Sequence, residues 1–268
     1  MFRCKQFTVA QDKCAMKVNT DSLILGSWAM LRADVKHAPR ILDIGTGSGI
    51  LALMMAQKAE SQLVDIEFRI DAIEIDKDAA AQAVVNFKKS KWAEQLHIHS
   101  CDLADFKPAY LYDTIISNPP YFDTPAKVSN AYNKQSHNRS VARQTSTLSP
   151  DELFNASSAL LIESGQMYCV YPASMEADII KTAAGHGLLL EAMLYVKHTS
   201  DKDPYLCAFR FSKAMRNAND GHADCTAYAD HLLFTTKVAN ENALIIRDRE
   251  GYYTNEYKAL CQPFYLKF

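Results

Sequence analysis

Four consecutive residues, Asn118, Pro119, Pro120 and Tyr121, follow the apolar run DTIIS. The side-chain oxygen of Asn118 and the main-chain carbonyl of Pro119 are two hydrogen-bond acceptors on a segment that the proline rings stiffen. Two such acceptors can orient a planar, conjugated nitrogen by binding one N–H each, and Tyr121 offers a flat face for stacking. The alternative is a rigid turn that ends a strand, with Asn118 capping the loop.

A glycine motif lies in RILDIGTGSGILAL, where Gly45, Gly47 and Gly49 separate a strand pattern from a helical pattern. Glycines at this spacing let the backbone turn sharply and approach a ligand near a helix N-terminus. A dinucleotide-binding G-x-G-x-x-G motif would need glycine where this chain has Ile50, so the match to a nicotinamide site fails. A tight turn without a ligand is the alternative.

Carboxylates stand at the ends of the first three expected strands, at the sheet edge where ligands of open α/β folds bind. Asp43 ends the first strand, Glu74 the second, and Asp102 follows the third. Glu74 can accept both hydroxyl groups of a ribose, and Asp102 can accept from the exocyclic amine of an adenine. The alternatives are helix N-caps, for Asp102 and for Asp76 beside Glu74.

Apolar, β-rich runs alternate with helical patterns, as in βαβ units on a largely parallel sheet. The segment between the last two runs is too short for a helical crossover, so these two strands should pair antiparallel. We expect an α/β fold with a doubly wound, seven-stranded, mostly parallel sheet, then a loop over 212–242 and a hairpin over 243–254. The expected strands are residues 40–44, 69–75, 96–100, 113–117, 166–172, 188–196 and 205–211, and helical patterns cover 49–59 and 78–89.

The composition favours a cytoplasmic, globular protein without a membrane partner. The chain has 268 residues, of which 48% are hydrophobic, and no apolar run is long enough for a membrane span or a signal peptide. Its seven cysteines include no C-x-x-C pair and fit reduced thiols. A net charge of -2 is compatible with nucleic acid binding through a local basic patch.

A metal site is the less favoured interpretation of HIHSC, in which His97, His99 and Cys101 alternate onto one face of a strand. Alternation of this kind occurs in any half-buried strand. A further ligand at metal-site spacing is missing, so we expect no metal.

The motifs LDIGTGSG, IEID, CDLADF and NPPY, in this order, resemble those of class I S-adenosylmethionine-dependent methyltransferases over residues 40–211. The resemblance implies a Rossmann-like fold with S-adenosylmethionine as cofactor. It also implies that the NPPY residues methylate a planar nitrogen, which adenine, guanine and protein glutamine all present. The implied cofactor contacts are Asp43, Gly45, Gly47, Gly49, Glu74, Asp102 and Asn118.

The N-terminal segment KQFTVAQDKCAMKVNTDSLILGSWA resembles the signature of bacterial tRNA1(Val) adenine N6-methyltransferases, and the closing EYKALCQPFYLKF also matches. The resemblance implies N6-methylation of the adenosine 3′ of the anticodon, with the anticodon stem-loop as partner and no obligate protein partner. In that family the element closes over the cofactor, which implies Lys17, Thr20 and Asp21 as cofactor neighbours. Thr20 and Asp21 also stand where an N-cap for the next helix is expected.

Basic residues outnumber acidic ones in the N-terminal segment and in residues 122–149. Such segments can contact phosphates and stack on unpaired bases, and a solvated loop is the alternative for any single residue. The implied tRNA contacts are Lys5, Lys13, Tyr121, Lys134, Arg139 and Arg143.

We expect a single methyltransferase domain over 1–268: a segment covering substrate and cofactor (1–39), the catalytic core (40–211) and an extension with a hairpin (212–268). The alternative activities are N-methylation of ribosomal RNA, DNA adenine or protein glutamine. In another class, the chain would bind S-adenosylmethionine and RNA without turnover. The part before Asp43 is too short for the helical substrate domain of the glutamine methyltransferases of release factors.

Overall fold

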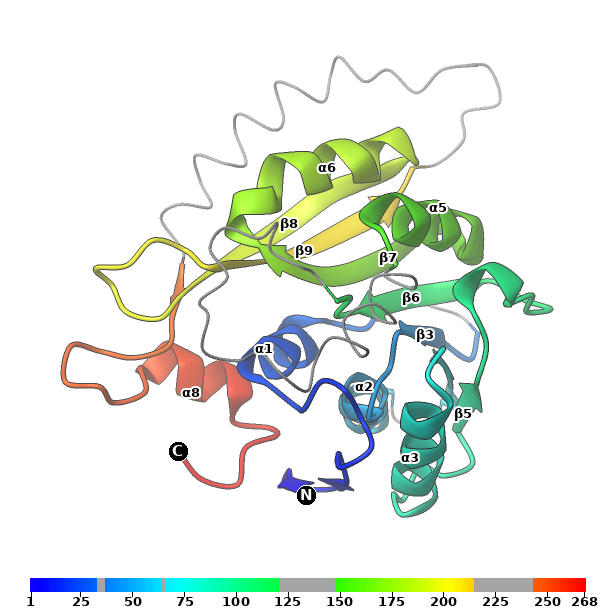
Figure 1. Ribbon diagram of the computed structural model, residues 1–268, viewed down its shortest axis with the longest axis horizontal. Helices are drawn as coiled ribbons and strands as arrows, with labels where there is room; N and C mark the ends of the chain where they lie inside the picture. Colours follow the sequence, from blue (N-terminus) through cyan, green and yellow to red (C-terminus); the bar gives the residue numbers. More distant parts are fainter. Residues whose placement is uncertain (33–36, 64–65, 121–147, 215–242) are drawn as a thin grey trace, which may run out of the picture.

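The computed structural model describes residues 1–32, 37–63, 66–120, 148–214 and 243–268. A main sheet crosses the molecule in the order β10-β8-β9-β7-β6-β3-β4-β5, and β1 pairs antiparallel with β2 apart from it (Figure 1). The strands are β1 (Phe2–Arg3), β2 (Thr8–Val9), β3 (Arg40–Ile44), β4 (Arg69–Ile73), β5 (Leu96–His99), β6 (Tyr112–Ser117), β7 (Leu161–Pro172), β8 (Leu188–Lys197), β9 (Leu206–Lys213) and β10 (Leu244–Ile245).

Strands β3 to β9 are the seven predicted from the sequence. β5, β4, β3, β6 and β7 run parallel, and β9 is antiparallel to both β7 and β8, which confirms the predicted antiparallel pair. The hairpin expected over 243–254 is reduced to one bridge between Arg247 and Tyr253, because Leu244 and Ile245 instead pair parallel with β8 as an eighth strand.

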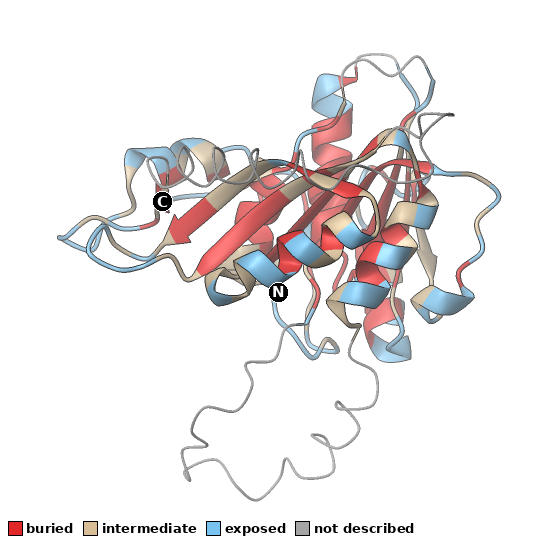
Figure 2. Ribbon diagram, turned by 90° about the horizontal axis from the view of Figure 1, so that it is seen from above, coloured by how far each residue is buried: buried red, intermediate tan, exposed pale blue. Residues whose placement is uncertain are grey.

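Helices cover both faces of the sheet (Figure 1). One face packs against α1 (Thr20–Trp28), α2 (Ile50–Gln62), α3 (Lys77–Lys88) and α8 (Asn255–Cys261), and the other against α5 (Pro150–Leu160) and α6 (Glu176–Gly185). Figure 2 shows the buried residues where these helices meet the strands. None of the helices in the described ranges combines the length and apolar character needed to cross a membrane.

Helix α1 begins one residue earlier than the motif predicted. The N-cap is Asn19, whose Oδ1 accepts a hydrogen bond from the Ser22 N–H at 2.9 Å, so the assignment of the cap to Thr20 or Asp21 was wrong. Thr20 already has helical geometry, and the amide of Asn19 fills the capping role that the sequence offered to its neighbours.

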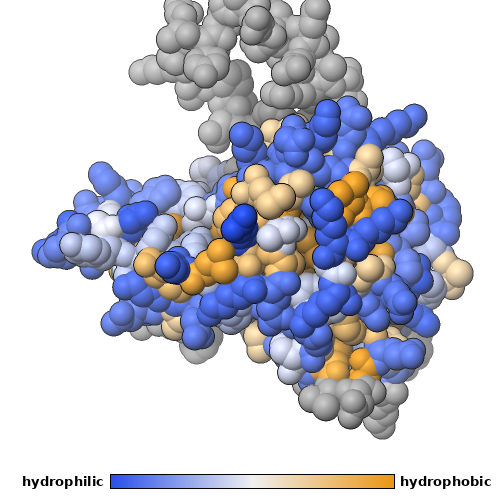
Figure 3. All heavy atoms as spheres, turned by 90° about the horizontal axis from the view of Figure 1, so that it is seen from below, coloured by the Kyte–Doolittle hydropathy of each residue, from blue (hydrophilic) through white to orange (hydrophobic). Residues whose placement is uncertain are grey.

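The other end of α1 is held by Lys58 of α2, which is 8% exposed. Its Nζ donates to the carbonyls of Ser27, at 2.7 Å, and Ala29, and burial lowers the pKa of this amine to about 8. Beside it a cavity of about 230 Å³ lies between α1, α2 and Pro263. Figure 3 shows the underside of the molecule, where hydrophobic residues emerge among hydrophilic ones.

No α-helix lies between β5 and β6, a stretch that the structure describes throughout; a 3-10 turn (Leu103–Asp105) and an extended segment connect them. This segment brings Tyr110 to the fully buried Asp71 of β4, to which its hydroxyl donates at 2.8 Å. Asp71 also accepts hydrogen bonds from the Tyr112 hydroxyl at 3.1 Å and from Nε and Nη2 of Arg69, both at 3.0 Å. His99 Nε2 lies 2.7 Å from Asp71 Oδ1. A satisfied carboxylate network therefore covers this part of the sheet.

Replacing Asp71 with asparagine should lower the free energy of unfolding at pH 7 by about 2 kcal/mol, because it removes the buried carboxylate that pairs with Arg69, whose side chain is 40% exposed. Burial alone would raise the pKa of Asp71, but the hydrogen bonds from Arg69, His99 and Tyr110 outweigh it and hold the pKa below its usual range. The stabilisation is therefore present above the pKa of the unfolded carboxyl and is lost as the pH falls through the lower folded pKa.

Urea unfolding at pH 7 and at steps down to pH 3 would measure this effect. The exposed Asp105→Asn is the matched control, expected within about 0.5 kcal/mol of wild type. A difference between Asp71→Asn and wild type that stays constant down to pH 3 would contradict the assignment.

Candidate functional site

Parallel pairing of β3 with β4 and β6 brings three motifs to one sheet edge. Ile44 is opposite Ile73 on one side and Ser117 on the other. The residues that directly follow these three are Gly45 of the glycine turn, Glu74 and Asn118 of the NPPY motif. All three motifs therefore lie at the same edge of the sheet. The Ser117 hydroxyl donates to the Ile44 carbonyl at 2.8 Å, which fixes the relative height of β3 and β6.

The glycine turn depends on left-handed backbone at Gly45, Gly47 and Gly49, with φ of 71°, 55° and 84°. A Cβ at Gly45 or Gly47 would meet no atom within 4 Å, so the space beside these two residues is open. A Cβ at Gly49 would lie 2.5 Å from the Phe87 ring, so here glycine allows α2 and α3 to pack closely. Two glycines thus border an open space, and the third has a packing role.

Asp43 supports the turn from below. Its Oδ2 accepts from the Thr46 hydroxyl at 2.6 Å and from the Ala52 N–H at 3.0 Å, which joins β3 to the turn and to α2. Burial raises the pKa of Asp43 to about 7; the hydrogen bonds from Thr46 and Ala52 act in the opposite direction, and the charge of Glu74 adds to the rise. The side chain is fully buried, which favours a bracing role over direct contact with a ligand.

Glu74 lies half-buried beside the turn. Its Oε2 accepts from the Gly47 N–H at 2.8 Å and its Oε1 from the Asp76 N–H at 2.9 Å. Each carboxylate oxygen has two lone-pair sites, so both can accept one further hydrogen bond, as a diol requires. The geometry leaves Glu74 able to bind a ribose without giving up its hold on the turn.

The structure shows the capping roles that were the alternative interpretation for Asp76 and Asp102. Asp76 Oδ1 accepts from Asp78 N at 2.9 Å and Ala79 N at 3.0 Å at the start of α3. Asp102 Oδ1 accepts from Ala104 N at 2.9 Å and caps the 3-10 turn after β5. Asp102 is exposed, so its second oxygen can still accept from a ligand.

The NPPY motif ends β6 with a buried acceptor. Asn118 Oδ1 is buried and has no hydrogen-bond partner among the described residues, Pro119 is buried, and Pro120 is exposed. A buried, unpaired amide oxygen costs about 1 to 3 kcal/mol unless a ligand satisfies it. Tyr121 lies outside the described residues, as do Lys134, Arg139 and Arg143.

The predicted contacts of the N-terminal segment are brought together only in part. Asp21 lies at the start of α1, where its Oδ1 accepts from the Tyr205 hydroxyl at 3.0 Å, and Thr20 is half-buried beside it. Lys13 and Lys17 are exposed. The Lys5 ammonium is turned toward the C-terminal segment, where it donates to the Gln262 carbonyl at 2.6 Å.

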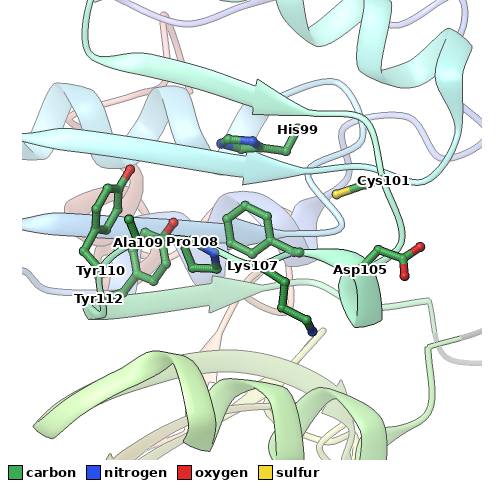
Figure 4. A pocket seen from close by; sticks show the side chains of 9 residues that line it. His99, Cys101, Asp105, Lys107, Pro108, Ala109, Tyr110 and Tyr112 are labelled. Carbon is green, nitrogen blue, oxygen red and sulfur yellow. The ribbon is translucent and has the colours of Figure 1, made fainter.

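A separate cavity of about 420 Å³ lies on the opposite side of β5 from α3, under the segment that leads to β6 (Figure 4). Figure 4 shows His99, Tyr110 and Tyr112 along it, and Phe106 also lines it. None of the glycines of the turn, Glu74 or Asn118 lines it. It belongs to the Asp71 network rather than to the strand-edge site.

Residues 19–140 match the methyltransferase small domain. The chain is 35% identical over 269 residues to the tRNA1(Val) (adenine(37)-N6)-methyltransferase of Proteus mirabilis, covering 100% of this chain and 94% of that protein. It is 37% identical over 280 residues to the protein of the same name from Pseudoalteromonas atlantica, covering 100% and 98%. The chain belongs to this methyltransferase family.

Solved structures agree on the fold. A predicted O-methyltransferase from Agrobacterium tumefaciens aligns with a TM-score of 0.59 at 16% identity, over 91% of this chain and 96% of that one. A putative class I S-adenosylmethionine-dependent methyltransferase from Listeria monocytogenes aligns with a TM-score of 0.50 at 14% identity, over 82% and 68%. The fold is that of the class I methyltransferases.

A class I methyltransferase takes its methyl group from S-adenosylmethionine, and the described residues fit this cofactor. The open space beside Gly45 and Gly47 can receive a ligand close to the backbone. Glu74 keeps lone pairs for two hydroxyl groups, and Asn118 holds an unpaired oxygen at the same edge.

Two polar residues of this site have no counterpart among the motifs, namely Gln82 and Asn86 on α3. Asn86 Nδ2 donates to the Ser48 carbonyl inside the glycine turn at 2.8 Å. The pattern that could have revealed them is a pair of amides four residues apart on an otherwise apolar helix face.

Replacing Gly49 with alanine should destabilise the protein by about 3 kcal/mol, because left-handed backbone costs about 1 to 2 kcal/mol and the clash with Phe87 adds overpacking strain. Gly187→Ala is the matched control: its φ is 72° and its Cβ would meet nothing within 4 Å, so only the backbone cost applies. Urea unfolding of both variants gives the difference, and equal losses would contradict the packing role of Gly49.

Asp43→Asn should reduce the pH dependence of stability. Because the folded pKa of Asp43 is raised, its favourable contribution is complete below about pH 4 and is lost as the pH rises to about 7. The asparagine oxygen can still accept from Thr46 and Ala52 without a buried charge. Urea unfolding at pH 5 and pH 8 should therefore show a smaller loss for the variant than for wild type, and equal losses would refute the raised pKa.

Proposed function

We propose that this chain transfers the methyl group of S-adenosylmethionine to N6 of adenosine 37 in tRNA1(Val), as the names of its full-length relatives state for those proteins. The observation that carries the proposal is the buried Oδ1 of Asn118, which has no hydrogen-bond partner in the part of the chain that the structure describes. Asn118 directly follows Ser117, the last residue of β6 paired with β3, and the glycine turn follows β3. A tRNA substrate would place this activity in the cytoplasm.

The proposed cofactor contacts follow from the geometry of the edge. The backbone of Gly45 and Gly47 would approach the methionine portion, and Glu74 would accept the ribose hydroxyls with its remaining lone pairs. Asp102 would accept from the adenine amine with the oxygen that does not cap the 3-10 turn. Asp43 would act indirectly, by holding Thr46 and the start of α2.

Asn118 and Pro119 would prepare the target nitrogen for attack. The lone pair of an exocyclic amine is delocalised into the ring, so the nitrogen is a poor nucleophile until its two N–H groups are held out of plane. Asn118 Oδ1 would accept one N–H and the Pro119 carbonyl the other, which directs the lone pair at the incoming methyl. Bound S-adenosylmethionine supplies that methyl on a sulfonium sulfur. The methylated nitrogen then loses its extra proton to water, so no strong base is required.

An adenosine of the anticodon loop is already unpaired, so presenting it requires less energy than flipping a duplex base. We propose Tyr121 as its stacking partner, a contact worth about 1 to 3 kcal/mol. Lys13, Lys134, Arg139 and Arg143 would contact the tRNA. Lys5 is the weaker candidate, because its ammonium already binds the Gln262 carbonyl.

Asn118→Ala should lower kcat for tRNA methylation by at least about 100-fold, as expected when a group that stabilises the transition state is lost. Asn118→Asp keeps an acceptor oxygen and should retain more activity. Ser157→Ala is the control, since Ser157 is a buried serine of α5 outside the motif. Transfer of labelled methyl to a tRNA1(Val) transcript would measure all three rates.

The same assay separates the substrate classes. Transcripts with adenosine or guanosine at position 37, ribosomal RNA, duplex DNA and a release factor would be offered in parallel. Methyl transfer confined to the adenosine 37 transcript supports the proposal. Transfer only to protein glutamine, or an Asn118→Ala rate equal to that of wild type, would overturn it.

A further inference from the structure

Gln82 and Asn86 are buried amides on one face of α3, with side chains only 8% and 2% exposed. They are four residues apart and therefore neighbours on the helix surface. Burying an amide is costly unless its hydrogen-bonding groups are paired, and here the partners lie outside α3.

Asn86 pairs with the backbone of the N-terminal segment and of the glycine turn together. Its Oδ1 accepts from the Ala10 N–H at 2.9 Å, and its Nδ2 donates to the Ala10 carbonyl at 2.9 Å. The same Nδ2 donates to the Ser48 carbonyl at 2.8 Å, between two glycines of the turn. One side chain thus connects the segment to the turn.

Gln82 holds the next stretch of the same segment. Its Oε1 accepts from the Lys13 N–H at 2.9 Å and from the Cys14 thiol at 3.2 Å. Its Nε2 donates to Asp12 Oδ1 at 2.8 Å. Residues 10–14 are therefore bound to α3 through two side chains.

The segment lies close to the carboxylate that faces the open space of the turn. Asn86 joins Ala10 to the Ser48 carbonyl, and Glu74 Oε2 accepts from the N–H of the adjacent Gly47 at 2.8 Å, so the segment and Glu74 are bound to neighbouring residues of the turn. Burial first, and then the charges of Glu74 and Asp76, raise the pKa of the Cys14 thiol to about 11. The chain then folds back, with Gln11 Oε1 accepting from the Val18 N–H at 2.7 Å. The return leads directly to Asn19, the N-cap of α1.

We propose that Gln82 and Asn86 are positioning residues that hold residues 10–18 beside the glycine turn and thereby set the affinity for S-adenosylmethionine. The inference rests on the proposed cofactor role of the turn and of Glu74. The positioning role of Gln82 and Asn86 differs from one that only stabilises α3, because every hydrogen bond named above for these two side chains ends on the segment or on the turn.

The test uses near-isosteric variants of the full chain. Asn86→Asp keeps the acceptor for Ala10 N but loses both donated bonds, and Gln82→Glu places a carboxylate against Asp12. Gln57→Glu is the matched control, because Gln57 is 5% exposed and donates to the Pro263 carbonyl at 2.8 Å, beside α8 and not beside the turn.

Calorimetric titration with S-adenosylmethionine, without tRNA, should give a Kd about tenfold higher for Asn86→Asp and for Gln82→Glu, the equivalent of about 1.4 kcal/mol. Hydrogen exchange of residues 8–18 should become faster in both. The kcat at saturating cofactor should stay within about twofold of wild type. Gln57→Glu should change the Kd, the exchange rates of residues 8–18 and the kcat by no more than about twofold.

Asp12→Ala keeps the experiment decisive if a buried variant fails to fold, since Asp12 is exposed and the change leaves α3 intact. It should raise the Kd about threefold with faster exchange over residues 8–18. Faster exchange with an unchanged Kd, or a raised Kd with unchanged exchange, would overturn the inference. Wild-type protein that binds S-adenosylmethionine but methylates no tRNA would refute the proposed substrate and leave this inference standing.

Discussion

The parallel pairing of β3 with both β4 and β6 is the constraint on which the site depends. It places Ile44, Ile73 and Ser117 opposite one another, so the residues that follow these three strand ends lie together at one edge of the sheet. The turn is then fastened to the neighbouring strand, because the N–H groups of Gly45 and Thr46 both donate to the Ile73 carbonyl at 3.0 Å. A slip of one residue in either pairing would turn every side chain of the slipped strand to the other face and separate the turn from its acid.

The carboxylates near the site differ in burial and in hydrogen bonding, and these differences determine their roles. Asp43 is fully buried, which raises its pKa, and it serves to brace the turn. Asp71 is equally enclosed but has donors on both oxygens, and it remains ionised as the centre of a network. Glu74 is half-buried and Asp102 is exposed at the edge, where a carboxylate can exchange water for ligand hydroxyls or amines at small cost.

The sequence was sufficient wherever local pattern decides structure. The strand RILDI was predicted with its observed bounds, Arg40–Ile44, because a continuous apolar run ends at a glycine turn. β7 was predicted five residues short, since it begins at Leu161, and ESG interrupts the apolar pattern where Ser164 adopts a φ of 61°. The contact of Tyr110 with Asp71 and the contacts of the α3 amides could not be predicted, because their partners are 39 to 76 residues away in the chain.

The N-terminal segment shows why substrate identity and cofactor binding need not be separate properties of this fold. Its sequence carries the resemblance to tRNA methyltransferases, yet its backbone is bound to α3 and, through Asn86, is connected to the glycine turn. Ordering ten or so residues costs about 1 kcal/mol or more each, which contacts within this segment alone do not repay. A segment held by α3 would present Lys13, proposed here as a tRNA contact, at a fixed place, whereas a free arm would lose that entropy on binding RNA.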